Sequence, residues 1–224
     1  MKISKILGKW LMVRSIACMA VLAIMLYVVP VHAVPIIDFS TGIDGVGGTI
    51  TPGATITGTD ILIGSMTAVG TTADGVYDVS GTGVRASGFT GLLNFAYDGG
   101  GTNWLTIVGG ISSLSIADGT TLVSGSFVNL TYDYDLYGNF IGIHGYGPDV
   151  KDRNLLTALG INPDTHFDFY GFSIGVNPPP ANSGPATVKS TDIINTAVPE
   201  PGTLLLLGSG LIALGLLGRK VRKA

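Results

Sequence analysis

FVNLTYDYDL, residues 127–136, carries two kinds of side chain in alternation. One face of a strand would receive Phe127, Asn129, Thr131, Asp133 and Asp135, and the other would receive Val128, Leu130, Tyr132, Tyr134 and Leu136. Successive side chains of a β-strand point to opposite faces, and antiparallel sheets commonly bury one face and expose the other. The stretch therefore predicts a half-buried antiparallel strand.

Turn signals and short apolar runs extend this pattern in both directions. Asp-Gly pairs, which suit turns with positive φ, stand at Asp74-Gly75, Asp98-Gly99 and Asp118-Gly119. The predicted strands cover residues 60–66, 75–79, 88–97, 103–108, 113–116, 122–136, 140–144, 166–176 and 187–196. No fixed-period repeat is present, so the pattern predicts an all-β ectodomain, an antiparallel β-sandwich or a jelly-roll-like fold.

One short helix is predicted within this domain. The predicted helix covers residues 149–159 and begins at Asp149. Leu155, Leu156 and Leu159 stand at helical spacing, and Gly160 follows as the residue that ends the helix. The next predicted strand, residues 166–176, would set Phe167, Phe169 and Gly171 against Asp168, Tyr170 and Phe172.

Charge is segregated along the 224 residues. Eight of the twelve basic residues lie at the two ends, whereas residues 34–201 hold four basic and all fifteen acidic residues, a net charge of −11. Phosphate binding needs clustered Lys and Arg, so this middle part is not expected to bind nucleic acid. The only cysteine, Cys18, lies in the N-terminal apolar segment, which excludes a disulfide framework in the middle.

The first 33 residues are typical of a cleavable signal peptide with a signal helix. Lys2, Lys5, Lys9 and Arg14 precede fifteen uncharged residues, 15–29, and Ala33 then supplies the small residue at the cleavage site. The Sec translocon and signal peptidase are the partners that such a segment implies. An uncleaved anchor is the alternative, but fifteen helical residues rise only about 22 Å, short of the ~30 Å hydrocarbon core.

The other end has three parts in order. Pro199-Glu200-Pro201 cannot continue a helix, residues 202–218 are uncharged and rich in leucine, and Arg219, Lys220, Arg222 and Lys223 close the chain. Seventeen apolar residues are just long enough for a transmembrane helix, and the basic cluster would stay on the cytoplasmic side.

This arrangement at residues 198–224 resembles the PEP-CTERM sorting domain. The resemblance implies that an exosortase, an integral-membrane protease, recognises Pro199-Glu200-Pro201 and removes the helix, after a transient stay in the membrane. It also implies a Gram-negative host that makes extracellular polysaccharide. The alternative is an ordinary tail anchor that carries the same tripeptide.

The middle part offers weak signals for chemistry. His166 has Asp164 and Asp168 two residues away on either side, but no G-x-S-x-G motif is present and the only glutamate, Glu200, belongs to the sorting signal. We therefore expect no catalytic activity. Asp133 and Asp135 partly resemble a calcium loop, but Tyr137 and His144 stand where further ligands belong. No metal-binding residues are assigned, and calcium at other Asp-Gly turns stays open.

Aromatic side chains suggest carbohydrate binding, because sugar sites often combine Trp or Tyr faces with Asp and Asn. The available residues are Trp104, Tyr132, Tyr134, Tyr137 and Tyr146. Trp104 is expected in the core, whereas Tyr137 and Tyr146, near glycine-rich turns, are expected to be exposed.

The sequence therefore divides into three predicted segments: a signal peptide at 1–33, a glycine-rich all-β ectodomain at 34–197, and the sorting signal at 198–224. The leading hypothesis is an exported, non-catalytic protein of the cell surface or extracellular matrix. The alternatives are a secreted carbohydrate-binding or carbohydrate-active module of the exopolysaccharide matrix, and a plain tail-anchored periplasmic protein.

Overall fold

The computed structural model describes residues 33–41, 47–85, 88–177 and 184–198, together with 208, 210 and 211. The chain divides into two compact units, Met1–Ala33 and Val34–Ala224, and the account below concerns the second. The predicted signal helix, Pro199-Glu200-Pro201 and the basic tail lie outside the described residues, as does nearly all of the predicted transmembrane helix. Among the residues that are described, no helix has the length and apolar character needed to cross a membrane.

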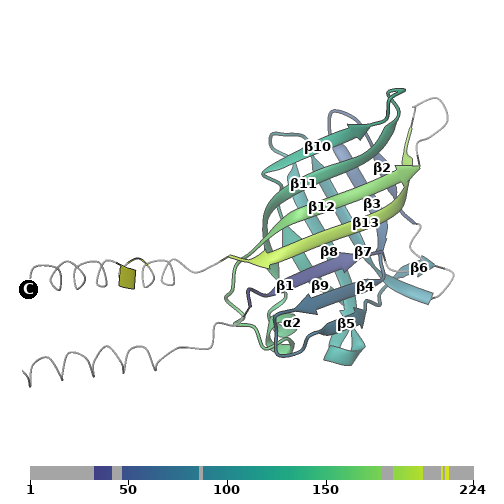
Figure 1. Cartoon of the computed structure of the whole chain (residues 1–224). Helices are drawn as coiled ribbons and strands as arrows, with labels where there is room; N and C mark the ends of the chain where they lie inside the picture. Colours follow the sequence, from purple (N-terminus) through teal and green to yellow (C-terminus); the bar gives the residue numbers. More distant parts are fainter. Residues whose placement is uncertain are drawn as a thin grey trace, which may run out of the picture. The chain divides into compact units, whose positions relative to one another are not determined.

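The second unit is built mostly of β-strands, which confirms the all-β prediction (Figure 1). The strands are β1 (Ile36–Ser40), β2 (Thr49–Thr51), β3 (Ile56–Ile63), β4 (Ser65–Val69), β5 (Gly75–Asp78), β6 (Gly83–Arg85), β7 (Gly88–Tyr97), β8 (Asn103–Ile111), β9 (Ile116–Gly125), β10 (Asn129–Tyr134), β11 (Phe140–Lys151), β12 (Phe167–Asn177) and β13 (Ala186–Ala197). A 3-10 turn, Ser112–Leu114, and a short helix, α2 (Arg153–Ala158), interrupt these strands.

The strands lie in two layers. In Figure 1, β10, β11, β12, β13, β1 and β4 run side by side, and β7, β8 and β9 cross behind them. All pairings are antiparallel. The ring β11-β9-β8-β7-β3-β2-β13-β12 returns to β11, so the sheet is a closed antiparallel barrel.

Two long strands close the ring. The prediction of a sandwich or jelly roll with two separate sheets is therefore wrong, because the strands form one closed sheet. β13 pairs with β1 near its end but with β2 at Ala186 and Thr187, and β11 pairs with β10 first but with β9 from Asp149 to Lys151. Each strand is 12 residues long, enough to pass from one layer to the other. A sandwich with separate sheets would leave edges that these pairings remove.

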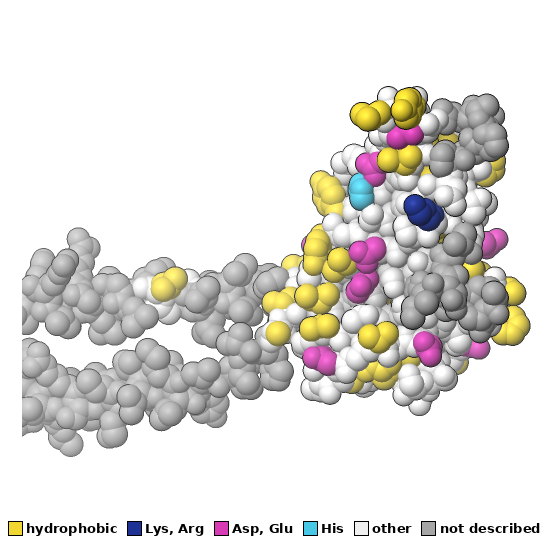
Figure 2. Space-filling view, turned by 45° about the vertical axis from the view of Figure 1, so that its right-hand side comes forward, with side chains coloured by type: hydrophobic (Ala, Val, Ile, Leu, Met, Phe, Trp, Pro, Cys, Tyr) yellow, Lys and Arg dark blue, Asp and Glu magenta, His cyan; other side chains and the backbone are white. Residues whose placement is uncertain are grey.

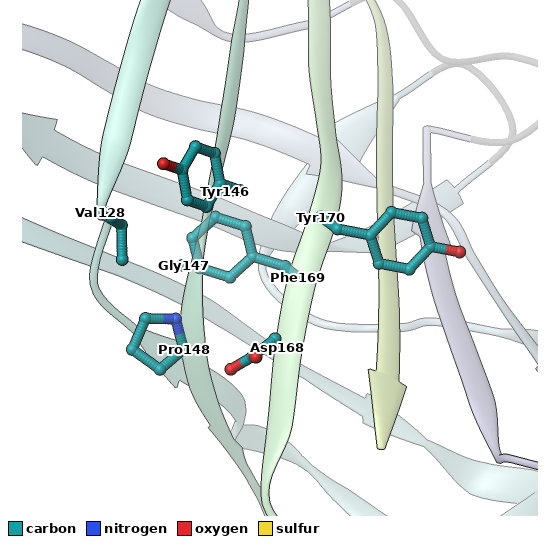
Figure 3. A pocket seen from close by; sticks show the side chains of 7 residues that line it. All are labelled: Val128, Tyr146, Gly147, Pro148, Asp168, Phe169 and Tyr170. Atoms are coloured by element: carbon teal, nitrogen blue, oxygen red, sulfur yellow. The ribbon is translucent and has the colours of Figure 1, made fainter. Parts of the chain in front are cut away.

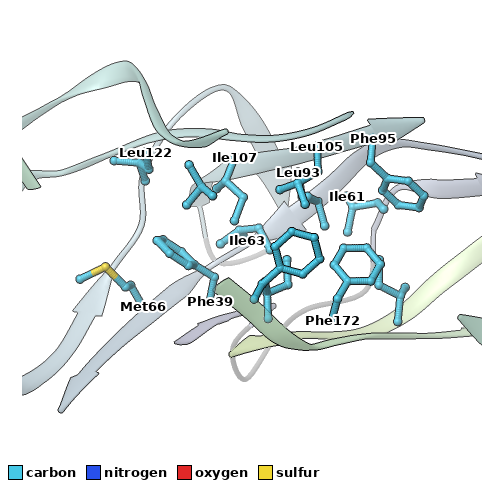
Figure 4. Close-up of a cluster of buried hydrophobic side chains, with 14 of the residues drawn as sticks. Phe39, Ile61, Ile63, Met66, Leu93, Phe95, Leu105, Ile107, Leu122 and Phe172 are labelled. Atoms are coloured by element: carbon cyan, nitrogen blue, oxygen red, sulfur yellow. The ribbon is translucent and has the colours of Figure 1, made fainter. Parts of the chain in front are cut away.

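The core lies between the layers and is rich in aromatic rings (Figure 4). Phe127 meets Phe95, Phe169 and Phe172 edge to face, with ring centroids 4.9 to 5.7 Å apart. Such aromatic pairs add about 0.5–1.5 kcal/mol beyond the area that they bury.

The strand that opened the sequence argument is shorter than predicted. The run 122–136 divides into the end of β9, a connection at 126–128, and β10. Alternation holds at the centre, where Leu130 is buried between exposed Asn129 and Thr131, but Val128, Tyr134 and Leu136 are exposed. Phe127, predicted on the polar face, is buried because the chain turns there into the aromatic core.

Strand β12 also departs from the predicted alternation. Phe167 and Phe169 are buried and Asp168 and Tyr170 are exposed, which fits the predicted division between two faces, but Phe172, predicted on the face of Asp168, is buried as well. The register against β13 shifts between Phe169 and Ser173, so a bulge resets which side chains face the core.

The predicted helix exists but starts four residues later than expected. Asp152 is its N-cap and accepts a hydrogen bond from the backbone of Leu155, whereas Asp149 to Lys151 continue β11. Leu155, Leu156 and Leu159 are buried, and Gly160 has a φ of +70°, which confirms the predicted stop.

Candidate functional site

A shallow pocket of about 450 Å³ lies on the outer side of β11 and β12 (Figure 3). Its lining residues are Val128, Tyr146, Gly147, Pro148, Asp168, Phe169 and Tyr170. They come from the β9–β10 connection and from two neighbouring strands, so the pocket depends on the pairing of β11 with β12. Such a concave, largely apolar surface with a few polar groups is the kind of place where ligands bind.

A bulge shapes this pocket. The register between β11 and β12 shifts between Gly145 and Gly147, where Tyr146 of β11 stands against two residues of β12, Tyr170 and Gly171. Bulges redirect side chains and interrupt the ladder. Tyr146 is 49% exposed and Tyr170 is 55% exposed, so two tyrosine rings stand at the surface of adjacent strands. Phe169, which is fully buried, contributes to the lining.

The pocket combines apolar rings with a single lining carboxylate. Asp168 is exposed on β12, between the buried rings of Phe167 and Phe169. Aromatic rings offer flat apolar faces, and a carboxylate accepts hydrogen bonds from hydroxyl groups. The arrangement is suited to a polyhydroxylated ligand or to a basic group. On the face in Figure 2, hydrophobic and acidic side chains lie interspersed and basic ones are scarce.

The aromatic residues that the sequence suggested for carbohydrate binding lie in different environments. Tyr146 is exposed as predicted and lies in the pocket, and Tyr137 is exposed as predicted, at 89%, on the β10–β11 turn. Trp104 was expected in the core but is 43% exposed on β8, because its inward neighbours there are Asn103 and Leu105. Tyr132 and Tyr134 stack on each other, 6.3 Å apart, outside the pocket lining.

The aspartate side chains at two turns accept hydrogen bonds from backbone N–H groups of the same turn. Asp98 accepts hydrogen bonds from the N–H groups of Gly100 and Thr102, and Asp135 accepts them from Tyr137 and Asn139. These bonds to the charged form hold the pKa of both carboxyl groups below the ordinary value. Gly99 and Gly119 have the predicted positive φ, whereas Gly75 does not.

The described residues contain no group of three His, Cys, Asp or Glu side chains placed to hold a metal ion. Asp133, from the partial calcium-loop pattern, instead lies 2.8 Å from His144, and both side chains are partly exposed. Calcium binding remains a prediction.

The histidine cluster suggested by spacing is not assembled. β12 begins at Phe167, so Asp164 and His166 lie in the preceding turn, while Asp168 points from the strand into the pocket. Asp164 accepts a hydrogen bond from Arg153 at 2.6 Å. The residues therefore serve different parts of the surface.

Sequence reasoning missed a buried polar cluster made of Asp149, Lys151 and Asn195. All three side chains face the core, and Lys151 Nζ donates to Asp149 Oδ1 and to Asn195 Oδ1, the second bond measuring 2.9 Å. Burial raises the pKa of Asp149 and lowers that of Lys151 to about 8. One signal was available: Gly147, Asp149 and Lys151 share the period of two that marks one face of a strand.

The two ends of the ectodomain leave the barrel together. β1 pairs with β13 from Ile36 opposite Thr196 onward, and the N–H of Ala197 donates to the carbonyl of Pro35. The N–H of Val198 donates to the carbonyl of His166. Ala33, the predicted signal-cleavage residue, is exposed. The residues next to the two predicted processing positions therefore lie side by side.

Comparison with known protein families finds one match. Residues 197–223 match the model of the PEP-CTERM protein-sorting motif, which confirms the resemblance found in the sequence. No curated protein and no solved structure matches the chain.

Proposed function

We propose that this chain is an exported, non-catalytic protein of the cell surface or extracellular matrix, released from the membrane by exosortase cleavage near Pro199-Glu200-Pro201. The PEP-CTERM motif at residues 197–223 carries the proposal. The motif marks the chain for export and membrane-associated sorting toward the surface, with an exosortase as the processing partner. The proposed route begins with the Sec translocon and with signal peptidase cleavage after Ala33.

The way the ends leave the barrel supports this order of events. Strand β13 is hydrogen-bonded through Ala197, and the N–H of Val198 is bonded to His166. A folded barrel thus presents the tripeptide immediately after its last paired strand. Cleavage there would release the ectodomain without removing any residue that the barrel uses.

A non-catalytic role agrees with how the acidic side chains are used. Glycoside hydrolysis needs two carboxyl groups across a cleft, whereas the pocket lining contributes one, Asp168. Asp98 and Asp135 hold their own turns, and Asp164 pairs with Arg153.

The experiment compares Glu200→Gln with the wild type in a host that has the exosortase and in the same host without it. Wild-type protein should leave the membrane fraction only when the exosortase is present, and Glu200→Gln should stay in the membrane fraction. Asp78→Asn, an exposed acid-to-amide change on β5, is the matched control and should behave as wild type. Release that is equal with and without the exosortase would overturn the proposal.

A second candidate function, binding of extracellular polysaccharide, is favoured by the pocket. Two exposed tyrosine rings beside Asp168 offer stacking faces and an acceptor for sugar hydroxyl groups. Co-sedimentation of the protein with the polysaccharide of its host tests this. Tyr146→Ala and Tyr170→Ala should each reduce retention, whereas Tyr137→Ala, at an exposed tyrosine outside the lining, should not. Equal retention of all three variants and the wild type would overturn the assignment.

A further inference from the structure

Three polar side chains from two strands meet inside the barrel. Asp149 and Lys151 point inward near the end of β11, and Asn195 points inward near the end of β13. The strand between them, β12, pairs with both. Asp149 is 4% exposed, Lys151 2% and Asn195 0%, so the cluster is shielded from water.

The cluster holds an amine against a carboxamide. Lys151 Nζ lies 2.9 Å from Asn195 Oδ1, and since a C=O bond is about 1.2 Å long, Nζ lies no more than about 4 Å from the carboxamide carbon Cγ. Asn195 is fixed in this orientation, because its Nδ2 donates to the carbonyls of Ile37 and Ile193, each at 2.9 Å. Lys151 also lies over the ring of Phe167, 5.0 Å from its centroid.

A carboxyl group stands beside the amine. Asp149 Oδ1 accepts from Lys151 Nζ, whereas Asp149 Oδ2 is buried with no hydrogen-bond partner. Burying an ion pair is expensive, and an unpartnered buried oxygen adds to the penalty. Burial favours the neutral forms of both groups, and the nearby charge of Asp168 further raises the pKa of Asp149. A proton shared between Asp149 and Lys151 leaves a neutral amine, which is a nucleophile.

We propose that Lys151 and Asn195 form an intramolecular amide (isopeptide) bond, with Asp149 as the residue that moves the protons. Two reacting groups held close in a dry site gain the large rate advantage of an intramolecular reaction. The fixed carboxamide, the neighbouring carboxyl group and the exclusion of water are the three requirements that the cluster meets.

The chemistry balances without a further reactant. Asp149 takes a proton from the Lys151 ammonium, and the neutral Nζ attacks Cγ of Asn195 to give a tetrahedral intermediate. A second Nζ proton passes to Nδ2 through Asp149, the Cγ–Nδ2 bond breaks, and ammonia leaves. Ammonia takes up the remaining proton as ammonium, so Asp149 ends as the carboxylate that it was at the start. One amide replaces another, and nothing is oxidised or reduced.

The bond would tie β13 to β11 across β12. β13 is the strand that runs directly into the sorting signal, and Asn195 precedes Pro199 by four residues. The cross-link would therefore hold the end of the barrel closed next to the point where the chain continues to the membrane. This consequence is independent of whether an exosortase cuts the chain, so the proposal does not rest on the proposed function.

Peptide mapping of the purified full chain tests the proposal. Trypsin should fail to cut after Lys151, and the digest should contain one branched peptide that joins Lys151 to Asn195 and is lighter by about 17 Da, the mass of one ammonia. Lys151→Met and Asp149→Asn should yield only linear peptides in this region. Lys189→Met, at an exposed lysine of β13, is the matched control and should keep the branched peptide.

The wild-type digest decides the matter even if a variant fails to fold. Free Lys151 and unmodified Asn195 in folded wild-type protein would overturn the proposal. A branched peptide that persists in Asp149→Asn would retain the bond but overturn the role given to Asp149.

Discussion

The backbone N–H of Ala197 donates a hydrogen bond of 3.1 Å to the carbonyl of Pro35, which joins the start of the ectodomain to its end. Thr196 faces Ile36 in the same pair of strands. The two termini of the ectodomain are therefore paired with each other, and the segment that enters the sorting signal is held by β1 on one edge and β12 on the other.

Ala197→Pro should weaken the pairing of the two termini. Proline has no N–H, so the bond to Pro35 is lost, and its ring restricts the backbone at the end of β13. We expect the free energy of unfolding to fall by about 1–3 kcal/mol, measured by urea denaturation. Ala197→Ser keeps the N–H and should stay within about 0.5 kcal/mol of wild type; equal losses in the two variants would contradict the role of this bond.

Phe127 should be among the most sensitive core positions. Its ring contacts Phe95, Phe169 and Phe172 although it lies in a connection between strands. Phe127→Ala should lower the free energy of unfolding by about 3–5 kcal/mol. Phe89, which is exposed on β7, provides the control, and Phe89→Ala should change stability by less than about 0.5 kcal/mol. A small effect of Phe127→Ala would show that the connection is not packed as described.

Asp38 should make the ectodomain less stable as pH rises. Burial, together with a hydrogen bond and repulsion from Asp192, raises the pKa of Asp38 from 3.8 to about 7. The folded state therefore binds the proton more tightly than the unfolded state, so this contribution is complete below pH 4 and is lost between pH 4 and 7.

Asp38→Asn tests this pH dependence. The variant should match wild type at pH 4 and exceed it at pH 8 by about 1 kcal/mol, a value reduced for partial exposure of the site. Urea denaturation at both pH values measures the difference. A variant less stable than wild type at pH 8 would show that the charged carboxylate is favourable where it lies.

The cluster of Asp149, Lys151 and Asn195 gives a stability test that separates a covalent link from an ordinary ion pair. Replacing a buried ion pair by apolar residues is often neutral or stabilising. An amide between Lys151 and Asn195, 44 residues apart, would instead stabilise by about 4 kcal/mol if it acts as a disulfide of that loop length does. Asp149→Leu/Lys151→Met should therefore unfold more easily than wild type, and equal or greater stability would count against the bond.

Local patterns in the sequence predicted strands better than they predicted how strands join. Residues 88–97 were predicted as a strand and form β7 with the same bounds, and the turn at Asp98-Gly99 follows its last residue. Barrel closure depends on pairings between distant segments, such as β13 with β2, and no local period encodes those.

Side-chain errors followed from the same cause. The alternation puts Phe172 on the face opposite Phe167 and Phe169, because the bulge in β12 cannot be recognised from alternation alone. The predicted helix begins at Asp149, whereas the structure buries this carboxylate on strand β11. Burying a carboxylate is costly unless it is paired, and its partner, Lys151, stands two residues away. Tyr146 was correctly expected at the surface, whereas Tyr170 and Asp168 joined it only through the pairing of β11 with β12.

The most direct test of the central claim identifies the C-terminal residue of the protein recovered from the surface or medium of an exosortase-bearing host, by tandem mass spectrometry. The account predicts a C-terminus at or next to Pro199-Glu200-Pro201, with residues 202–224 absent. Mature protein that ends at Ala224 would contradict it.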